Sequence, residues 1–273
     1  DLRFGLMQQI NYNGQILDRN VPLFSAEHFL KSTSNRLIER MKLSTVQDAI
    51  IESHYFALMS AMRVFRYEIP MSFTYEFFQA EVQKLIDNLP KQPFYFISFE
   101  VFQNASSTIE FLVTAEDVLH YNKELSYIDE VALYTDFLAS SKAYAMSELH
   151  TNQLIELAKG FLSDHPYGDC LLLNEKKELL RATKGDIILR FKDELKLPSQ
   201  TCGVVGSTFR LNLIDKLKRL SDYVPSETEL SPFDIQRADE FIIYDVFGGI
   251  QSVRKYKKST FDDSFARMLQ GLI

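Results

Sequence analysis

One segment combines residue types and spacing that suit ligand binding: Gly203-Val-Val-Gly-Ser-Thr-Phe-Arg210. Glycines followed by hydroxyl residues at the start of a predicted helix leave backbone N–H groups at the positive end of the helix dipole, which favours an anion such as phosphate. The same residues also fit an ordinary capped helix, with Ser207 or Thr208 as the N-cap. Taken by itself, the segment leaves both interpretations open.

Several common catalytic motifs do not occur in the sequence, namely GxGxxG, GxxxxGK[ST], HExxH and GxSxG. The sequence therefore gives no indication of nucleotide binding, zinc hydrolysis or serine hydrolysis by those routes. The histidines are scattered and show no metal-ligand spacing, so no metal site is predicted. They are His28, His54, His120, His150 and His165.

The composition is that of a globular protein with a buried core. The chain has 273 residues, of which 46% are hydrophobic and 25% charged. Its net charge of -7 argues against nucleic acid as a partner, and the one basic run, Arg254–Lys258, is expected to be a solvated strand end. No apolar stretch reaches the ~18–20 residues of a membrane helix. Cys170 and Cys202 form no CxxC pattern, which favours a reducing, cytoplasmic setting.

Hydrophobic periodicity predicts the elements that would position these residues. In the first half, Asn13-Gly14 indicates a hairpin turn, and prolines end the two predicted helices. The expected elements there are a strand at 36–42, helices at 46–66 and 74–89, and strands at 94–102 and 108–113.

The second half is expected to hold a similar mixture. Its predicted strands are 131–134, 170–174, 178–181, 186–191, 241–246 and one after Gly249, and its predicted helices are 152–162, 207–220 and 261–272, with a helical turn at Pro232. We therefore expect an α+β protein with two domains, residues 1–116 and 130–273, joined by a linker at 117–129.

Several segments, in order, resemble the class IV aminotransferases. In the second half these are Tyr167–Glu175, Lys184–Ile188, Gly206–Arg210, Ala238–Phe241 and Gly249–Val253; in the first half they are Asn13-Gly14, Ile38-Glu39, His54–Leu58 and Phe65–Pro70. That family includes branched-chain and D-amino-acid aminotransferases and aminodeoxychorismate lyase. The resemblance implies the two-domain fold of pyridoxal-phosphate enzymes of fold type IV.

The resemblance also implies a lysine that holds the cofactor as an imine, and here the sequence departs from the family. Matching Leu149-His150-Thr151-Asn152 to the family's Leu-Lys-Thr-Asn puts His150 at the lysine position. An imidazole forms no stable imine with the cofactor aldehyde. Lys142 is an alternative match, but it requires a compensating gap.

Two other family positions are replaced as well. Arg181 stands where the family has the glutamate that keeps the pyridine nitrogen protonated, and a guanidinium offers no acceptor for that proton. Ala57 replaces the phosphate-binding arginine of His-x-x-Arg-Leu. A phosphate cradle is retained in part by Ser207, Thr208 and Arg210, while Tyr244 and Asp245 fall at its later hydroxyl position.

These replacements predict a degenerate member of the family: a pseudoenzyme without bound cofactor that retains a pocket for a small anionic ligand. The resemblance further implies a homodimer. One alternative is an active pyridoxal-phosphate aminotransferase or aminodeoxychorismate lyase that uses Lys142. Another is a repurposed enzyme in which His150 acts as general acid or base and Arg181 holds a substrate carboxylate or phosphate.

Overall fold

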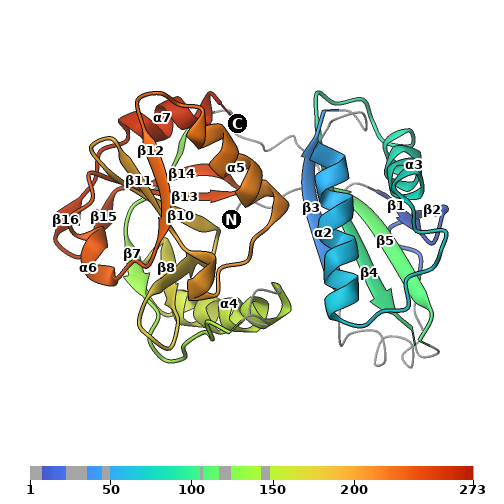
Figure 1. Ribbon diagram of the computed structural model, residues 1–273, viewed down its shortest axis with the longest axis horizontal. Coiled ribbons are helices and arrows are strands. Elements are labelled where there is room, and N and C mark those ends of the chain that lie inside the picture. The colour runs from blue at the N-terminus through green and yellow to red at the C-terminus, as the bar shows by residue number, and fades with distance from the viewer. Residues whose placement is uncertain are drawn as a thin grey trace. The chain divides into compact units, whose positions relative to one another are not determined.

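The computed structural model describes residues 8–22, 36–44, 50–104, 107–116, 124–142 and 148–272, with only the backbone of 148–151. The chain divides into two compact units, Asp1–Tyr121 and Asn122–Ile273. Each unit combines sheets and helices (Figure 1), which confirms the α+β prediction.

The first unit is built on a five-stranded antiparallel sheet of order β2-β1-β5-β4-β3. The predicted hairpin at Asn13-Gly14 is confirmed, because both residues have positive φ, 48° and 84°, as a tight two-residue turn between strands requires. The elements are β1 (Gln9–Tyr12), β2 (Gln15–Asp18), β3 (Leu37–Leu43), α2 (Ile50–Val64), α3 (Tyr75–Ile86), β4 (Tyr95–Gln103) and β5 (Ile109–Glu116).

Helices α2 and α3 pack on one face of this sheet through a single apolar cluster. Alternate residues of β4, namely Ile97, Phe99 and Val101, point into that cluster, as the two-residue period of a strand dictates. The side chain of Thr74 accepts a hydrogen bond from the backbone N–H of Phe77, which fixes the start of α3. The first unit thus has its own core.

The second unit contains a six-stranded sheet of order β12-β11-β10-β13-β14-β6 and a three-stranded sheet of order β7-β8-β9. Its strands are β6 (Ser126–Ile128), β7 (Val131–Leu133), β8 (Asp169–Leu173), β9 (Leu179–Ala182), β10 (Asp186–Phe191), β11 (Glu194–Pro198), β12 (Val224–Thr228), β13 (Glu240–Asp245), β14 (Gly249–Val253), β15 (Lys255–Tyr256) and β16 (Ser259–Thr260). Its helices are α4 (Glu148–Ser163), α5 (Thr208–Lys218), α6 (Pro232–Ile235) and α7 (Ser264–Gln270).

These elements form four layers, because three apolar clusters alternate with the sheets. One cluster joins α4 to the three-stranded sheet, the next joins the two sheets, and the third joins the six-stranded sheet to α5 and α7. In β10, Ile187 and Leu189 face the three-stranded sheet, while Ile188 faces the helices. Burial on both faces explains the three consecutive apolar residues in the middle of this strand.

The structure differs from the sequence prediction at several strands. Residues 126–128, within the range expected to be a linker, form β6, which pairs with β14 in parallel. Strand β12 was not predicted, since Val-Pro-Ser-Glu-Thr is polar and contains a proline, which is tolerated here because the strand lies at the sheet edge. Strand β11 and the β15–β16 hairpin were also missed, and the exact domain limits stay a prediction.

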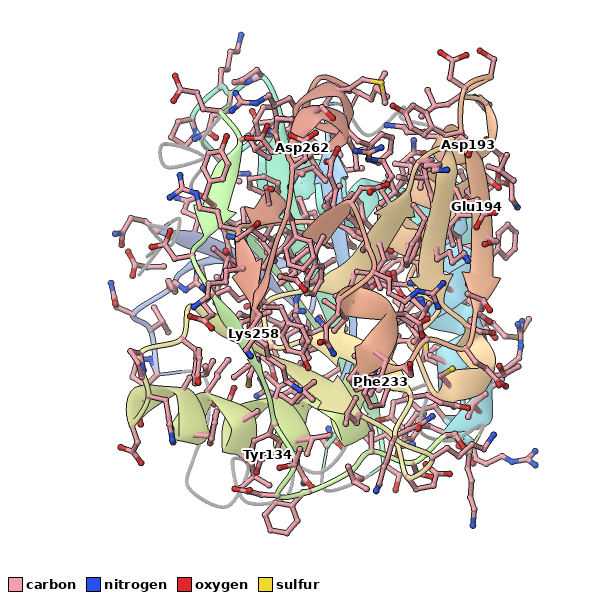
Figure 2. All side chains as sticks on the ribbon, turned by 90° about the vertical axis from the view of Figure 1, so that its left-hand side faces the viewer. Tyr134, Asp193, Glu194, Phe233, Lys258 and Asp262 are labelled. Carbon is pink, nitrogen blue, oxygen red and sulfur yellow. The ribbon has the colours of Figure 1, made fainter. Side chains whose placement is uncertain are left out.

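The basic run at 254–258 forms β15 and the following turn, with Lys258 labelled in Figure 2. Arg254 lies 2.9 Å from a carboxylate oxygen of Asp129, and Lys255 lies 2.8 Å from one of Glu130. These side chains are paired with acids of the same unit, which favours the interpretation as a strand end over a binding patch.

Candidate functional site

The candidate site lies at one end of the six-stranded sheet. The strand registers bring residues there from distant parts of the chain: Asp186 pairs with Tyr244, and Leu197 pairs with Glu227. Strand β11 finishes at this same end of the sheet, and helix α5 begins shortly after it in the sequence. Most of the second-half residues singled out from the sequence therefore lie close together.

The start of α5 is a capped helix. Ser207 is the N-cap, and its side chain accepts a hydrogen bond of 3.2 Å from the backbone N–H of Arg210. Thr208, at the first helical position, is buried. The capped-helix interpretation is confirmed; anion binding at this helix start stays a prediction.

Arg210 is fully buried, although arginine is among the residues least often found inside proteins. Its Nη1 donates to the Tyr244 hydroxyl at 3.2 Å, and its Nη2 donates to the Pro198 carbonyl at 2.5 Å and to Glu227 at 2.9 Å. An Asp186 carboxylate oxygen lies 3.8 Å from Nη1. We call these five residues the Arg210 cluster.

Burial and charge act against each other in the Arg210 cluster. Burial alone lowers the pKa of Arg210, but Tyr244, Asp186 and Glu227 together raise it above its usual value, so the guanidinium stays charged. Burial raises the pKa of Asp186; the guanidinium groups of Arg181 and Arg210 oppose that rise. Burial also raises the pKa of Tyr244, which therefore keeps its proton at neutral pH.

The two remaining candidates of the second unit, Arg181 on β9 of the three-stranded sheet and Asp245 at the end of β13, make contacts with the backbone. The Nε of Arg181 donates to the Ala182 carbonyl at 3.1 Å. The carboxylate of Asp245 accepts from the backbone N–H groups of Phe247 and Gly248 at 3.0 and 3.1 Å, which orders the turn into β14. Arg181 and Asp245 also act electrostatically on Asp186.

The two candidates for the imine position lie on a different segment. His150 is in the first turn of α4, and its side chain lies outside the described residues. Lys142 is exposed, and its backbone N–H donates to the Ser140 hydroxyl at 3.3 Å. The neighbouring Ser141 is bound by the carboxylate of Glu175 at 2.8 and 2.6 Å. No described contact joins either candidate to the Arg210 cluster.

The first unit carries its own motif residues. The Nδ1 of His54 lies 2.9 Å from a carboxylate oxygen of Glu39, which joins α2 to β3 inside the apolar layer. These two residues come from the two segments compared with the family's Phe-Glu and His-x-x-Arg-Leu. Ala57 is half-buried on α2. Their described contacts fit a structural link between helix and sheet.

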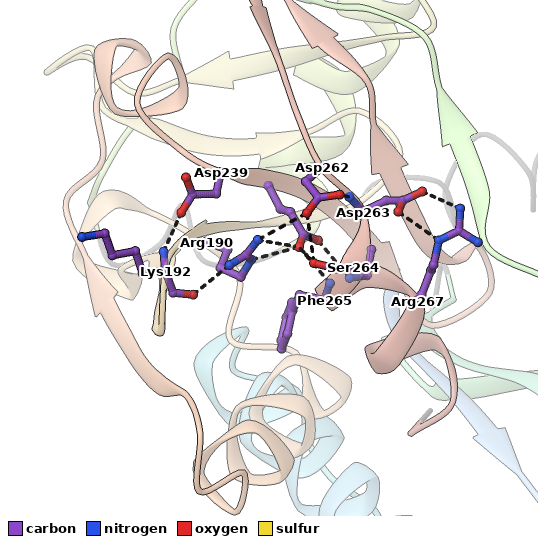
Figure 3. Close-up of polar contacts among 10 residues, drawn as sticks. Arg190, Lys192, Asp239, Asp262, Asp263, Ser264, Phe265 and Arg267 are labelled. Carbon is purple, nitrogen blue, oxygen red and sulfur yellow. Dashed lines mark hydrogen bonds and ion pairs between the residues drawn. The ribbon is translucent and has the colours of Figure 1, made fainter.

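A second polar cluster in the second unit joins β10, β13 and α7 (Figure 3). The carboxylate of Glu240 is fully buried and accepts from Arg190 Nε at 2.9 Å and from the backbone N–H groups of Phe265 and Ala266 at 2.8 and 3.0 Å. Glu240 thus satisfies the start of α7, which otherwise lacks acceptors. Its role is to anchor that helix.

Sequence reasoning missed the acidic partners of Arg210. Asp186 was expected only as the first residue of a strand, and Glu227 lies on the unpredicted β12. The available signal was a charged residue at a buried helical position, since a buried guanidinium requires acceptors nearby.

The described residues include no group of His, Cys, Asp and Glu that could hold a metal ion, and no described helix is long and apolar enough to cross a membrane.

Comparison with solved structures establishes the fold. The chain has the fold of class IV aminotransferases, fold type IV. No protein-family model matches the sequence, and a search of curated proteins finds no match. The similarity is therefore one of structure at low sequence identity.

Three of the similar structures illustrate this. The branched-chain amino acid aminotransferase of Thermobaculum terrenum in its PLP form superposes with a TM-score of 0.84 at 14% identity, covering 98% of this chain and 92% of that one. The Escherichia coli branched-chain amino acid aminotransferase gives 0.80 at 15%, covering 97% and 92%. A putative 4-amino-4-deoxychorismate lyase from Legionella pneumophila gives 0.74 at 16%, covering 93% and 95%.

The residues described at the Arg210 cluster fit pyridoxal phosphate only in part. A capped helix start with a nearby guanidinium suits a phosphate group. However, three acceptors of the protein already bind Arg210, and Arg181 provides no acceptor for a pyridinium proton.

Proposed function

We propose that this chain is a fold type IV protein that does not transaminate and that retains a binding site for a small anion at the start of α5. The observation that carries the proposal is the buried guanidinium of Arg210 in the first turn of α5, whose Nε has no hydrogen-bond acceptor among the described residues. A buried guanidinium with an unused N–H favours an anionic group, and Arg181, which offers no acceptor, disfavours a protonated pyridine ring.

The replacement at the imine position supports the same proposal. An imidazole at position 150 cannot supply the amine that the cofactor chemistry needs. The alternative amine, Lys142, is exposed. An exposed lysine also lacks the enclosed, desolvated pocket in which a nucleophilic lysine normally acts.

The test is the visible absorbance of the purified protein with and without added pyridoxal phosphate, followed by borohydride reduction and peptide mass spectrometry. We expect no cofactor band and no cofactor fixed to any lysine. Inorganic phosphate should perturb the amide NMR signals of residues 206–209. A band that disappears in Lys142→Arg but persists in Lys159→Arg, a control lysine on α4, would overturn the proposal.

A second candidate is an active pyridoxal-phosphate aminotransferase or lyase that uses Lys142. What favours it is the similarity to the Thermobaculum terrenum enzyme, whose structure is a PLP form. The spectrum described above separates the two candidates, since only this one predicts cofactor fixed to Lys142.

We also propose that the protein forms a homodimer and works in the cytoplasm. The dimer rests on the resemblance to fold type IV proteins, and the compartment on the two cysteines, which are free and buried. Light scattering should give twice the chain mass of 31.6 kDa. A mass equal to one chain would contradict the dimer.

A further inference from the structure

On one edge of the Arg210 guanidinium, only one of the two nitrogens has a hydrogen-bond acceptor among the described residues. Its Nη2 donates to Glu227 and Pro198, but the buried Nε on the same edge has no hydrogen-bond acceptor among the described residues. A guanidinium presents Nε–H and Nη2–H side by side, in the geometry that matches two oxygens of a carboxylate or phosphate. Glu227 accepts from Nη2 through Oε1 alone.

Glu227 is also the partner of Arg210 that is easiest to move. Its side chain is 34% exposed, whereas that of Asp186 is 14% exposed and Pro198 is buried. It lies on β12, which is hydrogen-bonded to a neighbour on one side only because it is the edge strand of its sheet. The Glu227 carboxylate is partly exposed, so water can solvate it when it turns away from Arg210.

We propose that the Nε–Nη2 edge of Arg210 is an oxyanion subsite that Glu227 occupies in the free protein, and that a ligand carboxylate or phosphate binds there by displacing Glu227. The proposal rests on the anion site proposed above and adds the mode of its regulation. The incoming anion gains the second hydrogen bond, to Nε, that Glu227 does not make.

The charges of the surrounding groups explain why displacement requires another anion. The guanidinium groups of Arg181 and Arg210 face the carboxylates of Asp186, Asp245 and Glu227. If Glu227 leaves without replacement, the buried Arg210 loses its nearest carboxylate, and an unpaired buried charge is strongly unfavourable. Glu227 therefore leaves Arg210 only when a ligand anion takes its place.

The experiment measures anion binding to the full chain with two probes, inorganic phosphate and acetate. The variants are Glu227→Ala, which opens the edge, and Glu227→Gln, which removes the charge but keeps an acceptor. The matched control is Glu229→Ala, which removes an acid two residues further along that is not a described partner of Arg210. The readouts are the dissociation constant and the NMR signal of the Arg210 Nε–H, with circular dichroism to check folding.

We expect both probes to bind Glu227→Ala about tenfold or more tightly than the wild type, since a competing hydrogen-bonded charge is gone. Their addition should shift the Nε–H signal, and Glu229→Ala should bind like the wild type. If Glu227→Ala fails to fold, Glu227→Gln carries the test with the same expected direction.

Two results would overturn the inference: unchanged affinity in both Glu227 variants, or an equal gain in Glu229→Ala, which would indicate general electrostatics. These results are distinct from failure of the proposed function. Phosphate binding in the wild type that is insensitive to Glu227 would keep the anion site and refute displacement. A shifted Nε–H signal without perturbation of the 206–209 amides would keep the subsite and refute the anion site at the helix start.

Discussion

Glu240 offers the sharpest test of the energetics of the second unit, because one guanidinium contacts one buried and one exposed carboxylate. Arg190 lies 2.9 Å from Glu240, which is fully buried, and 3.9 Å from Asp262, whose side chain is 63% exposed (Figure 3). Glu240 also accepts from Ser264 and from two backbone N–H groups of α7. The two acids therefore differ mainly in burial and in their contacts to α7.

We expect Glu240→Ala to reduce the free energy of unfolding by about 3–5 kcal/mol, the usual cost of removing one partner of a buried ion pair. The backbone N–H groups of Phe265 and Ala266 lose their acceptor as well, so α7 should loosen. For a unit of this size, such a loss corresponds to a melting temperature lower by roughly 6–20 °C. Asp262→Asn, the control, should cost about 0–1 kcal/mol because its ion pair is exposed.

Urea unfolding followed by circular dichroism measures both changes; the chain has no tryptophan, so intrinsic fluorescence reports tyrosine alone. Hydrogen exchange gives the local readout. In Glu240→Ala the amides at 265 and 266 should exchange faster than in Asp262→Asn. Equal stability of the two variants, or unchanged exchange at these amides, would refute the argument that burial decides the contribution of each carboxylate.

Three further predictions follow from single positions. Gly203 has φ 97°, and a Cβ there would lie 2.6 Å from the Ser140 carbonyl, so Gly203→Ala should destabilise the protein by more than about 1 kcal/mol in urea unfolding. Gly160, in α4, has no atom within 4 Å of such a Cβ, so Gly160→Ala should stabilise by about 0.5–1 kcal/mol, and a loss would contradict the helix assignment. Burial raises the pKa of Glu100 despite the opposing effect of Arg36. Its contribution to stability is therefore greatest below its unfolded-state pKa and is lost as pH rises through its folded-state pKa. Glu100→Gln should flatten the dependence of the free energy of unfolding on pH in that range, and an unchanged dependence would show that Glu100 does not titrate differently on folding.

Most elements could be predicted because their periodicity reflects the layers they contact. The apolar residues within 186–191 indicated a strand, and in the structure two apolar clusters cover its two faces. Strand β12 escaped prediction for the opposite reason. As an edge strand it needs few apolar residues and tolerates Pro225, so its sequence looks like a loop.

The candidate site could be predicted only in part, since its partners are set by strand register and not by local sequence. Ser207 and Thr208 were both recognisable as N-cap candidates from the local sequence, and the structure has Ser207. The pairing of Arg210 with Glu227 depends on the parallel alignment of β11 and β12, which no local pattern reveals. Short-range signals therefore identify the helix start, and long-range pairing decides what that helix start contacts.

The parallel pairing of β6 with β14 has a consequence for synthesis on the ribosome. Ser126 pairs with Gln251, so the first described strand of the second unit obtains this neighbour only after more than a hundred further residues have been translated. Until then, β6 remains an unpaired edge, the kind of segment that chaperones protect from association with other chains. The first unit, whose described strands all precede residue 117, can complete its sheet earlier.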